Sequence, residues 1–318
     1  MLQTKFGFVF PGQGSQSVGM LAELAMAYPL VKETYAEASA VLGYDLWKLT
    51  QEGPEQTLNQ TTYTQPALLA AGVAVWRVWQ SRTSAVPALL AGHSLGEYTA
   101  LVCADALEFT DALALVTARG RYMQEAVPEG QGAMAAILGL DDGRVIAACV
   151  AAQSEMAGEI VAAVNFNSPG QVVIAGHTKA VERAMDLAKQ SGAKRTLRLP
   201  VSVPSHCALM RPAALRLAQD LAKTRIQPPR IPVINNVDAA AAQDPAQIRD
   251  SLTRQLFQPV RWVEIVRSMA AEGIHALLEC GPGSVLTGLN KRIVPGLNCM
   301  AMSDPAGLEL ALTAIETA

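Results

Sequence analysis

Hydrophobic positions in this chain form short continuous runs, separated by longer segments with helical periodicity. The runs at Phe6–Phe10, Val86–Ala91, Pro232–Val237 and Ala276–Glu279 have the length of buried strands. Between them lie helical patterns, one of which, at Gln65–Trp79, is apolar on nearly every face and so predicts a buried helix. Buried strands alternating with helices are typical of a parallel sheet covered on both faces. We therefore predict an α/β fold.

The pattern changes between residues 129 and 202. There the chain predicts the order strand, helix, strand, strand, helix, strand, which is the ferredoxin-like (βαββαβ) arrangement. The expected strands are Ala133–Leu138, Ile160–Asn165, Gln171–Ala175 and Lys194–Pro200, and the expected helices are Asp141–Gln153 and Lys179–Ser191. We therefore expect a ferredoxin-like subdomain at 129–202, inserted into a main domain that comprises 1–128 and 203–318.

The segment Gly92–Gly96 (GHSLG) stands directly after the second apolar run and before a helical pattern. A G-x-S-x-G segment between a strand and a helix predicts a nucleophile elbow, which presents its serine above the sheet. The two glycines permit the sharp turn, and the N–H of Leu95 would then point at an oxyanion. An ordinary strand-to-helix turn is the alternative, but the flanking elements favour Ser94 as a nucleophile.

A nucleophilic serine needs a base, and the chain has four histidines. His206 lies in a loop where the chain re-enters the main domain, and it follows Ser94 in sequence, as in hydrolase-type sheets. A purely structural role for His206 is the alternative. We expect His93 to shape the elbow, His177 to be a surface or capping residue, and His275 to be packed or half-exposed. No acidic third member is apparent, so the sequence favours a Ser–His dyad oriented by a carbonyl group.

The glycine-rich loop after the first run does not fit a dinucleotide-binding fingerprint. With Gly12 and Gly14 as its first glycines, the third would fall at Ser17. Gly283–Gly288 is likewise no phosphate-binding P-loop, because Leu289 occupies the lysine position. A tight loop beside the elbow suits Gly12–Gly14 better, and there the N–H of Gln13 would supply a second oxyanion donor.

The composition and charge of the chain argue against several classes of binding partner. The 318 residues carry a net charge of −3 and only 5% are aromatic, which argues against nucleic acid or an anionic membrane as a partner. The five cysteines are widely spaced and none has metal-ligand spacing, so we expect free thiols and no metal. Met1–Lys5 does not resemble a signal peptide and no apolar run reaches about 20 residues. We therefore expect a cytoplasmic protein.

Six motifs, in order along the whole chain, together resemble the malonyl-CoA–acyl carrier protein transacylases. They are Phe10–Gln16, Gly92–Tyr98, Arg119–Met123, Asn165–Gln171, Val203–His206 and Glu279–Gly283. The resemblance implies a hydrolase-like α/β domain with a ferredoxin-like subdomain, which agrees with the pattern above. It also implies transfer of a malonyl group from malonyl-CoA to the pantetheine thiol of acyl carrier protein for fatty acid synthesis, through a malonyl-serine intermediate and without a metal or redox cofactor.

The resemblance assigns roles to particular residues. Ser94 matches the acylated nucleophile and His206 its base, while the N–H groups of Gln13 and Leu95 match the oxyanion hole. The two remaining residues are named by the resemblance alone: Arg119 matches the arginine that binds the malonyl carboxylate, and Gln255 matches a glutamine whose backbone carbonyl orients the histidine. A planar guanidinium suits the first role, because it binds a carboxylate through two hydrogen bonds.

Three alternatives remain open from the sequence. They are a serine hydrolase with the same elbow, a transacylase that serves polyketide synthesis or malonate breakdown, and a non-enzymatic CoA-binding or carrier-docking module. The segment Lys179–Arg198 contains six basic and two acidic residues, whereas the whole chain is acidic. This segment is a candidate docking face for an acidic carrier protein, with an ordinary solvated helix as the alternative.

Overall fold

A five-stranded parallel sheet forms the centre of the larger unit. The computed structural model describes residues 5–201 and 203–316, so residues 1–4 and the predicted boundary residue 202 lie outside the described residues. The strand order is β7 (Val233–Ile234), β2 (Leu89–Gly92), β1 (Phe6–Phe10), β8 (Ala276–Glu279) and β9 (Asn298–Ala301). Each neighbouring pair is parallel, which confirms the predicted sheet.

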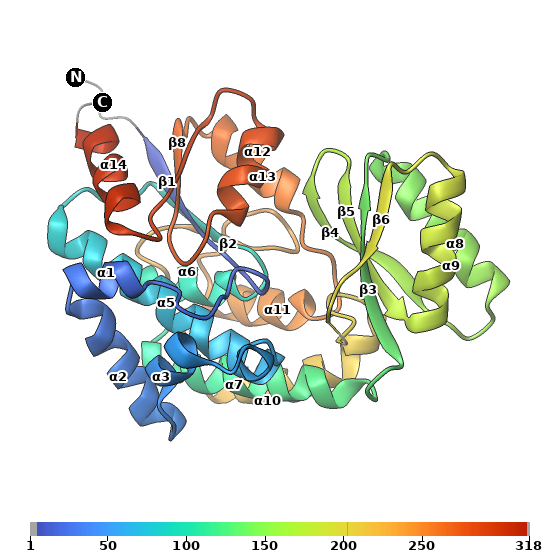
Figure 1. Cartoon of the computed structure of the whole chain (residues 1–318), viewed down its shortest axis with the longest axis horizontal. Helices are drawn as coiled ribbons and strands as arrows, with labels where there is room; N and C mark the ends of the chain where they lie inside the picture. Colours follow the sequence, from blue (N-terminus) through green and yellow to red (C-terminus); the bar gives the residue numbers. More distant parts are fainter. Residues whose placement is uncertain (1–4, 202, 317–318) are drawn as a thin grey trace.

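Helices cover both faces of this sheet (Figure 1). Phe6, Phe8 and Phe10 point to one face and belong to the larger core, where the ring of Phe8 lies 5.4 Å from that of Trp76. Val9 points to the other face and packs in a second core. The helices of this unit are α1 (Ala22–Ala27), α2 (Leu30–Leu42), α3 (Leu46–Glu52), α4 (Glu55–Leu58), α5 (Thr61–Arg82), α6 (Gly96–Cys103), α7 (Phe109–Ala126), α10 (Arg211–Lys223), α11 (Pro245–Gln255), α12 (Trp262–Ala271), α13 (Val285–Ile293) and α14 (Pro305–Glu316).

A second, four-stranded sheet lies beside the first unit, at the right of Figure 1. Its order is β4 (Val161–Ser168), β5 (Gln171–His177), β3 (Gly132–Leu138) and β6 (Arg195–Arg198), and its neighbouring strands are antiparallel. Helices α8 (Asp142–Glu155) and α9 (Thr178–Gln190) pack on one face of it. This is the ferredoxin-like order that the strand pattern predicts.

The other face of the small sheet turns toward the larger unit. Met134, Ala136 and Val173 of this face pack in one cluster with Cys207, which follows His206 in the chain. Strand β4 is fixed to the larger unit by backbone hydrogen bonds, in which Val260 donates to Val164 and accepts from Phe166. The space between the two sheets is where the predicted site residues meet.

Three elements, β7, β9 and α14, differ clearly from the sequence prediction. The strand predicted at 232–237 is confined to Val233–Ile234, because the side-chain oxygen of Asn235 accepts hydrogen bonds from the N–H groups of Val237 and Asp238, at 3.1 and 2.8 Å. Such an Asn-centred turn ends a strand. At the C-terminal end the chain adds β9 at the edge of the sheet and then α14, which the hydrophobic pattern had not indicated.

Candidate active site

Ser94 stands at the turn between β2 and α6, with a left-handed φ of 51°. This turn requires both glycines of the motif. A Cβ atom on Gly92 would lie 1.9 Å from the backbone of Gly96, and a Cβ atom on Gly96 would lie 2.1 Å from the carbonyl oxygen of Phe10. No side chain fits at these two positions, so only glycine there allows the chain to form the elbow.

The Ser94 hydroxyl contacts the imidazole of His206, with 2.8 Å between Oγ and Nε2. On the other side of the ring, Nδ1 lies 2.7 Å from the backbone carbonyl oxygen of Gln255. A carbonyl oxygen can only accept, so Nδ1 carries the proton and Nε2 is free to accept the Ser94 proton. Burial, together with the charge of Arg119, lowers the pKa of His206 to about 3, which keeps the imidazole neutral.

Arg119 extends from α7 into the same site and is 1% exposed. Its Nη2 donates to Ser94 Oγ at 3.1 Å and to the side-chain oxygen of Gln255 at 3.0 Å. Its guanidinium also lies 5.6 Å from the centre of the Tyr98 ring. Arg121, two residues along the helix, is exposed and lies against the Tyr122 ring instead. The two arginines, only two residues apart on α7, therefore lie in different environments, one buried in the site and the other exposed.

Gln13 and Leu95 line the same cavity as Ser94. Among the described residues, no hydrogen bond uses the backbone N–H of either residue. The side chain of Gln13 is held instead by a 3.4 Å hydrogen bond to Thr61 Oγ1. Two unused backbone donors beside the Ser94 hydroxyl form an arrangement that can stabilise an oxyanion.

The cavity around Ser94 has a volume of about 110 Å³, which is room for a small acyl group or several water molecules. Both units contribute to its wall. The larger unit supplies the polar groups, and the small sheet with its following segment supplies mostly apolar ones. The lining residues are Gln13, Gln65, His93, Ser94, Leu95, Arg119, Met123, Met134, Asn165, Leu199, Val201, Val203, Ser205 and His206.

Among the described residues, neither the other histidines nor the adjacent Cys207 forms a hydrogen bond with the Ser94 hydroxyl. His93 Nε2 lies 2.8 Å from Asn167 Oδ1, so the elbow is tied to the C-terminal end of β4. Nδ1 of His177 accepts a hydrogen bond from the Ile160 N–H, and His275 is exposed. Cys207 is buried, and burial raises the pKa of its thiol to about 11.

Two buried polar residues of the site had no predicted role. Glu97 is part of the elbow motif, and it accepts hydrogen bonds from Gln255 and from the backbone N–H of Asn236. Asn236 is fully buried and contacts the backbone of the elbow on both sides of His93. The sequence offered a signal for Glu97, because a glutamate three residues after Ser94 falls inside the elbow motif and at the start of a predicted helix. Nothing in the sequence marked Asn236.

The comparisons with known proteins bear directly on this arrangement. The family described as the acyl transferase domain matches residues 7–297. The chain belongs to this acyl transferase family. It is 61% identical to the malonyl CoA-acyl carrier protein transacylase of Salmonella typhimurium over 310 residues, which cover 98% of this chain and 99% of that one.

Solved acyl transferase structures share the fold closely. An acyl carrier protein S-malonyltransferase from Vibrio cholerae is similar with a TM-score of 0.94 and 61% identity, over 97% of this chain and 100% of that one. A malonyl-transacylase solved in complex with its type II PKS acyl-carrier protein gives a TM-score of 0.96 and 57% identity, over 99% and 100% of the two chains. The resemblance to malonyl-CoA–acyl carrier protein transacylases is thereby confirmed.

Among residues 5–201 and 203–316, no group of three or more His, Cys, Asp or Glu side chains is placed to hold a metal ion. In the same residues, none of the helices has both the length and the apolar character needed to span a membrane.

Proposed function

We propose that this acyl transferase moves the malonyl group of malonyl-CoA to the pantetheine thiol of acyl carrier protein, supplying fatty acid synthesis. The observation that carries the proposal is the buried guanidinium of Arg119, which lies 3.1 Å from the hydroxyl of a Ser–His pair. A serine nucleophile with a fixed cation beside it suits an acyl group that ends in a carboxylate. The relatives named as malonyl CoA-acyl carrier protein transacylases support the same reaction.

In the first half-reaction, we propose that His206 Nε2 takes the proton of Ser94 Oγ as this oxygen attacks the thioester carbonyl of malonyl-CoA. The negative charge that forms on the carbonyl oxygen is stabilised by the N–H groups of Leu95 and Gln13. The C–S bond then breaks, His206 returns its proton to the departing sulfur, and CoA leaves as a thiol. The product is a malonyl ester of Ser94.

The second half-reaction reverses these steps with a different thiol. The pantetheine thiol of the carrier gives its proton to His206 and attacks the ester carbonyl, and the same two N–H groups stabilise the oxyanion. Ser94 leaves and recovers its proton from His206, so the enzyme returns to its starting state. These steps use only groups of the chain and of the two substrates, which supports a reaction without a cofactor.

Gln255 has a positioning role in this proposal. Its backbone carbonyl accepts the proton-bearing Nδ1 of His206 at 2.7 Å, which fixes the tautomer that the reaction needs. Arg119 selects the acyl group, because malonyl and acetyl thioesters differ by the carboxylate that a guanidinium binds. A site that leaves a buried charged group unpaired with the wrong substrate discriminates strongly against that substrate.

The mass of the intact protein after incubation with malonyl-CoA tests the proposal. We expect one added malonyl group on the wild-type protein and none on Ser94→Ala, with both proteins folded by circular dichroism. The label should survive in buffer and disappear when a holo carrier protein is added. A label that water discharges as fast as the carrier does would indicate a hydrolase, and full labelling of Ser94→Ala would refute the choice of nucleophile.

We also propose the division of the chain into a catalytic domain at 1–128 and 203–318 and a ferredoxin-like subdomain at 129–202. The strands between Gly132 and Arg198 form a sheet of their own, which supports these limits. A cytoplasmic location is proposed as well, and the five cysteines support it, because each is a buried free thiol as expected in a reducing compartment. Limited proteolysis and mass analysis of the fragments would test the proposed boundaries.

A further inference from the structure

Glu97 is a buried carboxylate in the site that no step of the proposed reaction uses. It lies in the first turn of α6 and is 2% exposed. One of its oxygens, Oε2, accepts both a 2.8 Å hydrogen bond from the side chain of Gln255 and a 2.9 Å hydrogen bond from the backbone N–H of Asn236. Burying a carboxylate away from water is costly unless hydrogen bonds compensate for the lost hydration. The two groups that donate to Glu97 therefore indicate its role.

The first donor leads to Arg119 and Ser94. Nε2 of Gln255 donates to Glu97 and also to the backbone carbonyl of Ser94 at 3.0 Å, so its oxygen faces Nη2 of Arg119 at 3.0 Å. Glu97 thereby fixes which end of this amide faces the guanidinium. If the amide turned over, it would present N–H groups to Arg119, and two donors would oppose each other.

The second donor leads to the strained turn that carries the nucleophile. The side-chain oxygen of Asn236 accepts the Ser94 N–H at 2.6 Å, and its side-chain nitrogen donates to the Gly92 carbonyl at 2.6 Å. Asn236 thus holds the backbone on both sides of His93. Because Ser94 has a left-handed φ of 51°, this turn needs such external support.

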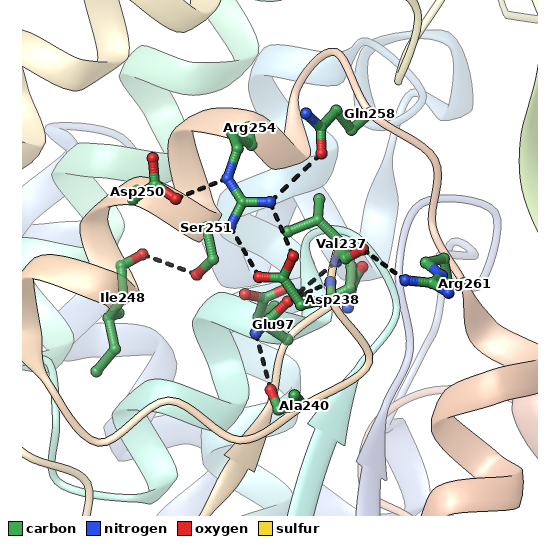
Figure 2. Close-up of polar contacts among 12 residues, drawn as sticks. Glu97, Val237, Asp238, Ala240, Ile248, Asp250, Ser251, Arg254, Gln258 and Arg261 are labelled. Atoms are coloured by element: carbon green, nitrogen blue, oxygen red, sulfur yellow. Dashed lines mark hydrogen bonds and ion pairs between the residues drawn. The ribbon is translucent and has the colours of Figure 1, made fainter.

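The segment after β7 is also fixed from its outer side. Figure 2 shows Glu97 next to Asp238, with Arg254 reaching over from the last turn of α11. Arg254 holds both oxygens of Asp238, at 2.9 and 2.7 Å, and also Asp250 at 2.6 Å. Arg254 directly precedes Gln255, so the elbow, the segment after β7 and the end of α11 are joined into one unit around Glu97.

We propose that Glu97 is a positioning residue for malonyl transfer, which acts through the Gln255 amide on Arg119 and through Asn236 on the elbow of Ser94. This inference rests on the proposed function. It deepens that function, because the selection of the malonyl group then depends on Glu97 as well as on Arg119. Glu97 touches neither the Ser94 hydroxyl nor His206 among the described contacts, so its effect on the reaction is indirect.

The structure supplies a sharp pair of substitutions. Both hydrogen bonds end on one oxygen, so Glu97→Gln can accept both with its single amide oxygen, whereas Glu97→Leu can accept neither. Acylation rates with malonyl-CoA and acetyl-CoA, measured as kcat/KM, report the two effects separately. We expect Glu97→Leu to lower the malonyl rate by about 10²-fold, the usual result of misplaced reacting groups, and the acetyl rate by clearly less. Glu97→Gln should restore the ratio of the two rates.

Glu279 provides a matched control, because it too is a buried carboxylate; it lies at the end of β8, in the sheet whose strand β2 leads into the elbow. Its two oxygens accept one backbone N–H each, from Leu286 at 3.1 Å and Thr287 at 2.7 Å, at the start of α13. Glu279→Gln must lose one of these bonds. It should lower the melting temperature and leave the malonyl-to-acetyl ratio unchanged.

Gln255→Met keeps the experiment decisive if Glu97→Leu fails to fold. Methionine removes the side-chain amide but retains the backbone carbonyl that faces His206, so the ratio should fall as in Glu97→Leu. An unchanged ratio in the folded Leu and Met variants would overturn the proposal, as would a Glu97→Gln variant that loses as much as Glu97→Leu. A wild-type protein that forms no malonyl-enzyme would instead overturn the proposed function.

Discussion

Replacing Arg119 by methionine removes the charge in the site while keeping most of the side-chain volume. The guanidinium is 1% exposed and lies 3.1 Å from the Ser94 hydroxyl, so a malonyl carboxylate bound beside it would be shielded from water. Leaving one member of such a buried pair without its partner costs about 3–5 kcal/mol. At about 1.4 kcal/mol for each factor of ten, kcat/KM for acylation by malonyl-CoA should fall by about 10²–10⁴-fold.

The acetyl group has no carboxylate, so acylation by acetyl-CoA should change much less in Arg119→Met. Arg121→Met is the matched control, since the Arg121 side chain is exposed and lies against Tyr122, and it should leave both rates near those of the wild type. The assay is acylation of Ser94 followed by intact mass with either thioester, with folding checked by circular dichroism. Equal losses for malonyl-CoA and acetyl-CoA would refute the reasoning and make Arg119 a structural residue.

His206→Ala should slow acylation by about 10²–10⁴-fold, the usual contribution of a positioned general base. A much larger loss in a folded His93→Ala variant would show that His206 is not the base. The neutral imidazole is the base and its pKa is lowered to about 3, so protonation of His206 should lower the wild-type acylation rate only as the pH falls toward that value. Carrier docking concerns the six basic residues of Lys179–Arg198, three of which already form ion pairs with acidic side chains. Helix α9 covers the face of the small sheet that points away from Ser94. We therefore expect the exposed Lys194 and Arg195 to contribute most to carrier binding. Reversing both charges should raise the KM for carrier at low salt without changing acylation by malonyl-CoA, and an unchanged KM would exclude this surface.

The strands that the hydrophobic pattern predicted well are those buried on both faces. Phe6–Phe10 is a continuous apolar run because residues on both sides of the strand lie in a core, and its prediction was confirmed to the residue. Residues near the end of a strand depend more on local hydrogen bonds than on hydrophobicity. Asn235 shows this at β7, where its side chain ends the strand within a run that had predicted a longer one.

The site divides in the same way between local and distant information. The position of Ser94 follows from its own neighbours, since two glycines and the flanking elements define the turn. Arg119 and Gln255 are 136 positions apart and meet only in the folded protein, so no local pattern could assign them a common site. Asn236 shows the limit most clearly, because its contacts with the elbow span more than 140 positions and a single buried amide leaves no periodic signal.

The wall of the Ser94 cavity is divided between the two units of the chain, each with its own sheet. The larger unit holds Ser94, His206 and Arg119, whereas the small sheet and its following segment contribute Met134, Leu199 and Val201. Side chains of the second group can change in size without moving Ser94, His206 or Arg119. Descendants of such a protein could therefore come to accept longer or branched acyl chains through substitutions in the insertion, while inheriting the reaction itself unaltered.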